Sequence, residues 1–532
     1  MAATTLTSPI SDNQRWTRRF LWLLMGVILF RVIYLFTAVD FELSGDEAYY
    51  WDWGRRPDWC YYSKPPLIGW LMGLLRVVFG YNWWAVRLAS ITLGTLSLSL
   101  LFALGRRLFD ARTGFFAALM LLLTPANAAA NFGLTIDSPL ILCWIAALLA
   151  FWHVITRPAS RGGWLVLTLA IGIGTLAKQM MLAFPGAMLL FALCSPPDRA
   201  LLKRPAFWLC ILGGLAFLLP MLWWNLQHGM VTLTHTQEHF HHHANLPFPK
   251  RLGQFLSFPA IQAGVWSPIT FGLLIAALVG CARAWNSLDQ RARFLFLFSA
   301  PGLATVLLLA MRQEINPNWP AVFYLSAFVL GASTALRTPT ITPWLRHGLT
   351  FGAALTLVLY LAIPLIPVLG LKGSKKLDPC VSMRGWAEAG QIIGKLYARV
   401  PRPNHTFVLV LDHRHNASQM AFNMPQHPRV YRWNPEGKIE SQYEVWPNGA
   451  DKIGWDGFVI YPDSPEDHYQ KKGLQNVVAK AFKQVQKLGD ADVMIGNGVQ
   501  RSFQVFLGES MAHWPGPDVA KPPAQQKPAP PP

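Results

Sequence analysis

Long apolar runs alternate with short polar connections up to residue 371 of the chain. An α-helix needs about 20 apolar residues to cross the roughly 30 Å hydrocarbon core of a bilayer. We therefore expect a mainly α, polytopic membrane domain over residues 20–371, with about 11 spans and additional interfacial helices. The expected spans are 20–39, 84–105, 112–129, 138–156, 162–177, 179–194, 206–224, 260–282, 294–311, 318–336 and 347–369.

Basic residues gather in every second connection between these spans. If the basic segment 1–19 lies in the cytoplasm, the whole series follows the positive-inside rule. The first span is longer than the core of a secretory signal and no small-x-small cleavage site stands out, so we expect an uncleaved anchor. An odd number of spans then predicts a C-terminus outside the cytoplasm. The basic connections carry Arg106, Arg107 and Arg112, then Arg157 and Arg161, then Arg199, Lys203 and Arg204, then Arg283, Arg291 and Arg293, and finally Arg337 and Arg346.

The composition agrees with a membrane protein and changes how the charge is interpreted. Hydrophobic residues make up 52% of the 532 residues, charged residues make up 14%, and the mean hydropathy is +0.28. These values are too apolar for a soluble protein of this size. The net charge of +18 is divided among short clusters between apolar runs, so membrane topology explains it better than binding of nucleic acid does.

Three stretches lack the pattern of a lipid-embedded helix. The first outer loop, 40–83, is rich in Asp, Glu, Tyr and Trp, and it ends in a short apolar piece that we expect to lie at the membrane interface. A second outer loop, 225–258, is rich in histidine. From residue 372 to 513 the composition predicts an extracytoplasmic α/β domain. The proline-rich tail, 514–532, is expected to be extended or disordered.

Within the predicted α/β domain, strands and helices follow from the periodicity of apolar residues. The runs 407–411 and 458–461 predict strands, whereas 384–399 and 474–488 have helical periodicity. The fold class is therefore a helical membrane domain with a C-terminal α/β domain.

The segment GDEAYYWDW in the first outer loop carries the strongest chemical signal. Ser44 and Glu47 have the spacing of a capping box, so a helix should begin here with Asp46 in its first turn. Glu47 thus has a structural explanation beside a role in substrate binding. Asp46 shares a helical face with Tyr49 and Tyr50, and an acid flanked by aromatic rings suits a sugar. The alternative is that Asp46 only interacts with the positive end of the helix dipole.

Lys64 follows Tyr61 and Tyr62 in the motif YYSKPP. The two prolines after the lysine end any helix and hold the chain extended. A cation on a stiff loop at the membrane surface is suited to binding a phosphate, and the two tyrosines are expected to contact substrate. The alternative for Lys64 is a side chain that snorkels at the interface.

With these motifs the sequence resembles the protein-mannosyltransferase-like group of bacterial membrane glycosyltransferases, which have the GT-C fold and include the lipid A aminoarabinose transferases. The resemblance is carried by GDEAYYWDW, YYSKPPLIGW, TIDSPL, LAKQMM, WWNLQHG, EINPNWPAVFYL, ASQMAFNMPQHPRVY and ESQYEVW, in this order along the chain. It implies a sugar donor linked to polyprenyl phosphate. It also implies that Asp137 is a second acidic residue near the active site and that Lys178 binds the phosphate of the carrier.

Asp137, Lys178 and Arg312 are all predicted at the outer surface. From composition alone, Asp137 is the cap of a helix begun by Pro139. Lys178 and Arg312 depart from the positive-inside rule, so we expect another reason for them, such as binding a phosphate headgroup. An ion pair with Glu314 is an equal alternative for Arg312.

Metal chemistry has a weaker signal. His235 and the run HFHHH at 239–243 suggest a zinc site, but no second ligand group stands at a useful spacing, and we favour a polar loop near the carrier. Asp46 and Asp137 are a thin ligand set for a divalent ion. We therefore assign no metal site and expect that no cofactor is required, with a divalent ion as the alternative.

The six cysteines fall into two groups. Cys143, Cys194, Cys210 and Cys281 lie in or beside spans, where a thiol behaves as a small apolar group. Cys60 and Cys380 are both predicted outside, where a disulfide between them is permitted but not determined by the spacing.

Together these features predict an inverting glycosyltransferase of the bacterial inner membrane that works at the periplasmic face. Its predicted partners are a polyprenyl-phosphate sugar and an envelope acceptor, such as lipid A, another glycolipid, a polysaccharide or a protein. Asp46 takes the proton if the acceptor is an alcohol, while Lys64, Lys178 and Arg312 stabilise the leaving phosphate. A phosphate acceptor needs no base, and Asp46 then orients a substrate.

Two other classes of function are compatible with parts of this pattern. A transporter or flippase of lipid-linked sugars would retain the spans and the basic sites, but its charges belong near the bilayer midplane and it often has inverted repeats. Here the charges gather at the outer surface and no repeat is visible. A non-catalytic protein whose outer domain binds envelope polymers is the third alternative.

Overall fold

The computed structural model describes residues 9–241, 247–374, 376–434, 438–462, 474–496 and 498–515. The chain divides into two compact units, each assembled from segments that are far apart in the sequence. The first, the helical unit, comprises Met1–Thr37, Val86–Leu219 and Gln237–Leu361. The second, the mixed unit, comprises Ala38–Ala85, Pro220–Thr236 and Ala362–Pro532.

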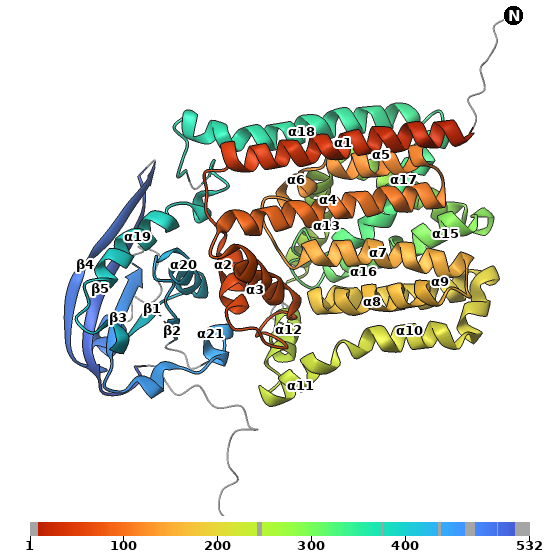
Figure 1. Cartoon of the computed structure of the whole chain (residues 1–532). Helices are drawn as coiled ribbons and strands as arrows, with labels where there is room; N and C mark the ends of the chain where they lie inside the picture. The colour runs from red at the N-terminus through yellow and green to blue at the C-terminus, as the bar shows by residue number, and fades with distance from the viewer. Residues whose placement is uncertain are drawn as a thin grey trace, which may run out of the picture. The chain divides into compact units, whose positions relative to one another are not determined.

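The helical unit is built from the predicted apolar runs (Figure 1). Six helices in the described residues are long and apolar enough to cross a membrane, or seven if one bent pair counts as a single span. The other four expected spans coincide with shorter apolar helices. The 12 residues of Ala111–Leu122, for example, extend only about 18 Å, so the expected count of 11 full crossings is not confirmed. The helices are α1 (Pro9–Thr37), α4 (Trp83–Leu108), α5 (Ala111–Leu122), α6 (Pro125–Ala130), α7 (Asp137–Thr156), α8 (Arg161–Ala177), α9 (Ala183–Cys194), α10 (Pro205–Ala216), α13 (Phe248–Trp266), α14 (Pro268–Arg283), α15 (Gln290–Leu297), α16 (Ala300–Leu309), α17 (Ala321–Arg337) and α18 (Thr342–Val368).

One expected span, 260–282, is broken instead of straight. Helices α13 and α14 meet at an angle of 114°. Ser267 separates them with a positive φ of 68°, a conformation that L-residues with a side chain seldom adopt. Pro268 follows and has no N–H group with which to continue the hydrogen bonds of α13. A hydropathy window averages over this break, which is why the sequence predicted one continuous helix.

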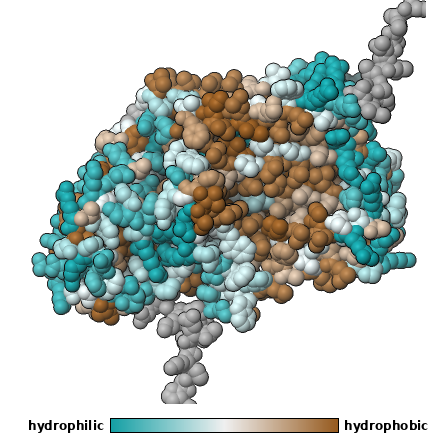
Figure 2. Space-filling model, in the orientation of Figure 1, coloured by the Kyte–Doolittle hydropathy of each residue, from teal (hydrophilic) through white to brown (hydrophobic). Residues whose placement is uncertain are grey.

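The sides of the helical unit are apolar, and its interior buries aromatic rings. Figure 2 shows hydrophobic residues over the flanks of the long helices and hydrophilic residues at the end where α1 begins. Inside, Trp144, Phe151 and Phe184 are fully buried. The buried Arg31 donates to the side-chain oxygens of Asn131 at 2.8 Å and Asn127 at 2.6 Å. These bonds compensate the cost of placing a cation inside the helical unit.

The mixed unit contains a five-stranded sheet in the order β2-β1-β3-β5-β4. Strand β1 pairs in parallel with both β2 and β3, whereas β3–β5 and β5–β4 are antiparallel. The predicted strands at 407–411 and 458–461 are confirmed, as is the helix predicted at 384–399, which is α19 (Trp386–Tyr397). The strands are β1 (Thr406–Leu411), β2 (Val430–Trp433), β3 (Asp456–Pro462), β4 (Phe482–Gly496) and β5 (Val499–Met511).

The helix predicted at 474–488 is wrong over most of its length. Helix α22 covers only Leu474–Ala479, and Phe482 begins the long strand β4. Strand β4 forms a long ladder with β5, and this pairing outweighs the weak helical periodicity of the segment. The tail predicted to be extended lies almost entirely outside the described residues.

The first outer loop folds into two short helices of the mixed unit, α2 (Gly45–Gly54) and α3 (Leu67–Phe79). They approach closely at two glycines: a Cβ atom added to Gly54 would lie 2.4 Å from the backbone nitrogen of Gly73. Helix α3 leaves Leu74 and Val77 exposed, as expected for a helix that lies at a membrane interface.

Candidate active site

Helix α2 begins with the capping box that the sequence predicts. The Ser44 N–H donates to Glu47 Oε2 at 2.9 Å, and the Glu47 N–H donates to Ser44 Oγ at 3.2 Å. Glu47 is only 2% exposed, so its carboxylate has a structural function whether or not it also contacts substrate. Asp46, the preceding residue, points outward with 57% of its side chain exposed.

The carboxylate of Asp46 faces a basic segment from the C-terminal part of the chain. Helix α20 (Arg414–Asn423) follows strand β1 and places His415 Nε2 3.2 Å from Asp46 Oδ1. This hydrogen bond, together with the positive charges of Arg414 and Lys64, holds the pKa of Asp46 below its usual value, although partial burial acts in the opposite direction. Asp46 is therefore a carboxylate near neutral pH, and Lys64 lies close enough to act on it.

The four tyrosines predicted to contact substrate are buried in the mixed unit. Tyr49 and Tyr50 are 2% and 6% exposed, and Tyr61 and Tyr62 are 0% and 7% exposed. The Tyr49 hydroxyl accepts the backbone N–H of Gln442. The open aromatic face expected beside Asp46 is thus covered by a distant part of the chain, and substrate contact by these tyrosines stays a prediction.

Burial and hydrogen bonding give α2 a fixed position. The buried Asp52 pairs with Arg55 at 2.9 Å and accepts a hydrogen bond from the Tyr443 hydroxyl at 2.8 Å. Arg55 also donates to the backbone oxygens of His427 at 2.6 Å and Pro428 at 3.0 Å. These bonds join the end of α2 to residues that are more than 370 positions later in the sequence. Long-range contacts therefore fix the position of the helix that carries Asp46.

The loop that carries Lys64 is anchored by backbone contacts rather than by prolines alone. The Tyr61 N–H donates to the Lys64 carbonyl at 3.1 Å. Thr232, at the start of α12 (Val231–His241), donates to the Tyr61 carbonyl at 2.9 Å. The Cys60 thiol lies 3.5 Å from the Thr232 hydroxyl. Cys60 and Cys380 are both buried thiols. The structure therefore contains no disulfide between these two described residues.

In the helical unit, Asp137 accepts two hydrogen bonds from side chains. Lys178 Nζ donates to its Oδ1 at 2.7 Å, and Asn318 Nδ2 donates to its Oδ2 at 2.6 Å. The N-cap of α7 is Ile136, and Asp137 is the first helical residue. The alternative that Asp137 caps this helix is therefore wrong: its carboxylate binds two side chains from other segments of the helical unit and no backbone group of its own helix.

Helix directions place this pair at the end opposite the basic connections. Helix α7 runs from Asp137 for 20 residues, about 30 Å, before the basic connection at Arg157. Helix α8 starts at Arg161 and returns to Lys178. In Figure 1 the start of α1, the α9–α10 connection and α15 also lie at one end of the helical unit. The distribution of charge along the helices is thus consistent with the predicted register.

Arg312 does not pair with Glu314. Both side chains are exposed, and no ion pair or side-chain hydrogen bond of Arg312 occurs within the described parts of the chain. This removes the pairing alternative and leaves contact with a ligand as the remaining prediction for Arg312.

The histidine-rich loop is only partly described. His235 in α12 has its ring centroid 4.6 Å from that of Tyr62. The side chains of His239 and His241–His243 lie outside the described residues, so the zinc alternative is not tested there. Among the residues that are described, no three His, Cys, Asp or Glu side chains converge into a group that fits a metal ion.

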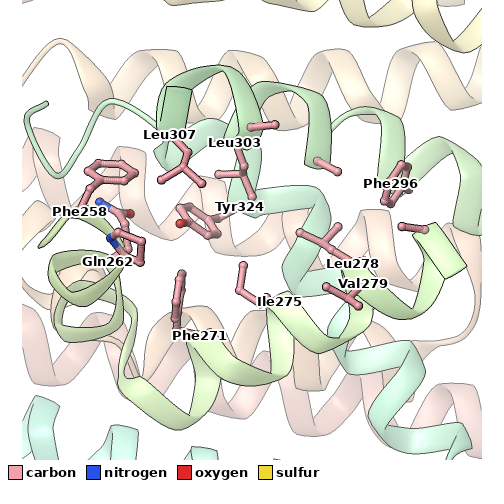
Figure 3. A pocket seen from close by; sticks show the side chains of 14 residues that line it. Phe258, Gln262, Phe271, Ile275, Leu278, Val279, Phe296, Leu303, Leu307 and Tyr324 are labelled. Atoms are coloured by element: carbon pink, nitrogen blue, oxygen red, sulfur yellow. The ribbon is translucent and has the colours of Figure 1, made fainter. Parts of the chain in front are cut away.

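An apolar cavity of about 270 Å³ lies among helices α13 to α17 of the helical unit (Figure 3). Gln262 and Tyr324 supply polar atoms to a lining that is otherwise apolar. Gln262 Nε2 donates to the Pro317 carbonyl at 3.1 Å, and the next residue, Asn318, binds Asp137. The wall of the cavity is therefore connected by one short loop to the Asp137–Lys178 pair.

Sequence reasoning missed the contribution of the segment DHRHN, residues 412–416. His413, Arg414 and His415 follow the carboxyl end of β1, which pairs in parallel with both of its neighbours. Polar residues at this position of a parallel strand often form sites, and that signal was available. The role of Asn318 as a partner of Asp137 had no comparable local signal.

Sequence comparisons place the chain among membrane glycosyltransferases. The model of the dolichyl-phosphate-mannose-protein mannosyltransferase family matches residues 63–224. The chain is 28% identical over 433 residues to the lipid A galacturonosyltransferase RgtD of Rhizobium johnstonii, which covers 80% of this chain and 87% of that protein. Over 126 residues, 23% of each chain, it is 34% identical to the undecaprenyl phosphate-α-4-amino-4-deoxy-L-arabinose arabinosyl transferase of Pseudomonas aeruginosa.

The comparison of structures gives the same fold over almost the whole length. ArnT from Cupriavidus metallidurans bound to undecaprenyl phosphate superposes with a TM-score of 0.62, covering 91% of this chain and 97% of ArnT, at 17% identity. Its apo structure gives a TM-score of 0.58 at 18% identity. The chain is therefore a membrane glycosyltransferase of the GT-C fold, related to the lipid A aminoarabinose transferases.

Proposed function

We propose that the protein transfers a sugar from a polyprenyl-phosphate carrier to an acceptor of the bacterial envelope, at the periplasmic face of the inner membrane, with inversion at the anomeric carbon. The names of its relatives support this donor: one is an undecaprenyl phosphate-aminoarabinose transferase, and one is a lipid A galacturonosyltransferase. The single observation that carries the proposal is the exposed Asp46 carboxylate, which is hydrogen-bonded to His415 and has its pKa lowered by this bond and by the charges of Arg414 and Lys64.

The proposed reaction is one displacement. An acceptor oxygen attacks the anomeric carbon, the bond to the carrier phosphate breaks, and the phosphate leaves as a monoester that retains the bonding electrons. Asp46 accepts the proton when the acceptor is an alcohol, a role for which an ionised carboxylate is required. Lys64 and Arg312 are the proposed cations for the leaving phosphate.

Asp137 and Lys178 are proposed to act as a pair. Their side chains are 14% and 13% exposed, so the hydrogen bond between them is partly shielded from water and orients the ammonium group. The two remaining N–H bonds of Lys178 are then available for the carrier phosphate. In this arrangement Asp137 fixes the position of the lysine. This role explains why an acidic residue lies close to the proposed site of the carrier phosphate.

The test is transfer by purified protein in liposomes that contain a polyprenyl-phosphate sugar labelled in the sugar. Lipid A is expected to accept label, because the relative that matches 80% of this chain is named a lipid A galacturonosyltransferase. Another glycolipid, a polysaccharide and a protein are offered in parallel as acceptors. If no acceptor gains label and no polyprenyl phosphate is released, the proposal is wrong.

A further inference from the structure

The first turn of α20 is packed directly on the start of α2. His415 Nε2 lies 3.2 Å from Asp46 Oδ1. Two further bonds fix the contact: Gln419 Nε2 donates to the Leu43 carbonyl at 2.7 Å, and Ser418 Oγ donates to the Gly45 carbonyl at 3.4 Å. The helix that carries His415 is therefore hydrogen-bonded to the residues before and after Ser44, the N-cap of α2.

The absence of a side chain at residue 45 makes room for the imidazole ring. A Cβ atom added to Gly45 would lie 2.5 Å from Cγ of His415 and 2.7 Å from its Nδ1. Carbon atoms do not approach so closely, so any other residue at this position must displace the ring. The three nearest atoms to a Cβ atom at residue 45 all belong to His415, whose Nε2 contacts Asp46.

The direction of the hydrogen bond follows from the charge on Asp46. The positive charges of Arg414 and Lys64 help to lower the pKa of this carboxylate. Burial and nearby positive groups lower the pKa of the neighbouring His413 to about 3, so His413 is neutral near pH 7. Asp46 is ionised and has no hydrogen to donate, so His415 Nε2 must carry the hydrogen. The bond engages Oδ1. Within the described residues no hydrogen bond to Asp46 Oδ2 is present.

We propose that His415 is a positioning residue for the transfer reaction, which holds Oδ1 of Asp46 so that Oδ2 is directed at the acceptor. This inference rests on the proposed function of Asp46 as the proton acceptor. The inference gives the C-terminal α/β segment a function in the reaction, beyond covering the active site. A carboxylate that is free to rotate loses part of the benefit of being held in a productive geometry.

Kinetics of single and double variants test whether His415 acts through Asp46. His415→Ala should lower kcat by about 10- to 100-fold, while KM for the donor stays within about twofold. His415→Gln retains an N–H donor and should recover most of the lost rate. In the Asp46→Asn background, His415→Ala should cost little more, because the group that it positions is already disabled.

Two further variants separate positioning from a general structural effect. Gly45→Ala keeps both side chains but displaces the ring, and should lower kcat to a similar extent as His415→Ala. His405→Ala is the matched control, since His405 precedes β1 at the end opposite α20 and is exposed; its activity should equal that of the wild type. If His415→Ala lowers kcat by the same factor in the Asp46→Asn background as in the wild type, the proposal is wrong.

A chemical measurement tests the contact independently of turnover. His415 is 37% exposed, so acylation by diethylpyrocarbonate can be followed by mass spectrometry of the full-length protein. Asp46→Ala releases Nε2 and should raise the rate of acylation at His415 at least about twofold, with no change at His405. If Asp46→Ala raises the acylation rate of His415 but the wild type transfers no sugar, the contact is correct and only the proposed function is wrong. If Asp46→Ala leaves the acylation rate of His415 unchanged, the contact between His415 and Asp46 is wrong.

Discussion

Lys178 and Asp137 are partners in a partly buried ion pair, and each depends on the other. Lys178→Met leaves Asp137 with Asn318 as its remaining side-chain partner. Removing one partner of a buried pair destabilises more than removing both, because an uncompensated charge remains. We expect Lys178→Met to raise KM for the donor about tenfold or more and to lower the unfolding temperature in detergent.

The double variant Lys178→Met/Asp137→Asn is the control for stability. It should recover part of the unfolding temperature but none of the affinity for donor, and Lys178→Arg should retain more affinity than Lys178→Met. A wild-type KM in Lys178→Met would show that this lysine does not bind the carrier phosphate.

Asp46 provides a prediction for the dependence of stability on pH. Because its pKa is lowered in the folded protein, the ionised group stabilises the fold above the ordinary carboxyl pKa of about 3.9. That contribution is lost as the pH falls through the lower, folded-state pKa. The stabilising contribution of Asp46, measured as the difference in unfolding temperature between the wild type and Asp46→Asn, should therefore narrow as the pH falls below about 4. A difference that does not narrow below this pH would contradict the assignment.

Local contacts at the residue scale were predictable, but long-range contacts were not. The capping box of Ser44 and Glu47 depends on three residues of spacing, and it is present as predicted. Tyr49 lies on the expected helical face, yet Gln442 covers its hydroxyl from 393 residues away. Asp137 was interpreted as a cap because Pro139 is close in sequence, whereas its partners Lys178 and Asn318 are 41 and 181 residues distant.

At the scale of elements, the packing of α2 on α3 depends on the absence of side chains at their crossing. A Cβ atom at Gly54 would meet backbone atoms of Gly73 and Met72 at 2.4 and 2.8 Å. Backbone atoms cannot rotate away, so Gly54→Val must separate the two helices. We expect a loss of about 1–3 kcal/mol in the free energy of unfolding, measured by thermal unfolding in detergent. Transfer activity should also fall, because Asp46 belongs to α2 and Lys64 lies just before α3.

Gly26→Ala is the matched control for the glycine prediction. An added Cβ atom at Gly26 meets nothing within 4 Å, so alanine should be neutral or stabilising through its higher helix propensity. Similar losses in Gly26→Ala and Gly54→Val would mean that glycine is needed for a reason other than this close approach.

The elements that the sequence predicted incorrectly depend on features that local periodicity does not contain. Apolar length and periodicity identified almost all helices of the helical unit, because lipid requires each to satisfy its own backbone. The segment 482–488 has some helical periodicity but becomes part of β4, since β5 offers a long antiparallel partner. The break at Ser267 is likewise set by one backbone conformation, which an average over apolar residues does not detect.

At the scale of the whole molecule, the orientation in the membrane is a prediction from the basic connections. Lys203 lies in one of them, and Asp451 lies in the C-terminal α/β segment; both are exposed. In intact spheroplasts, a membrane-impermeant maleimide should label Asp451→Cys, and should label Lys203→Cys only after permeabilisation. The native cysteines supply the background to be subtracted. Labelling in the reverse order would invert the topology and place the proposed site in the cytoplasm.

The central claim is that Asp46 accepts a proton in transfer of a sugar from a lipid-linked phosphate. Its most direct test is release of labelled polyprenyl phosphate by protein in liposomes with an alcohol acceptor, compared between the wild type, Asp46→Asn and Asp58→Asn. Asp58 is the matched control because it belongs to the same outer loop and its carboxylate accepts only the N–H of Trp59 among the described residues. We predict that Asp46→Asn lowers the rate by about 10²–10⁴-fold while Asp58→Asn retains the wild-type rate. Release by Asp46→Asn at the wild-type rate would contradict the account.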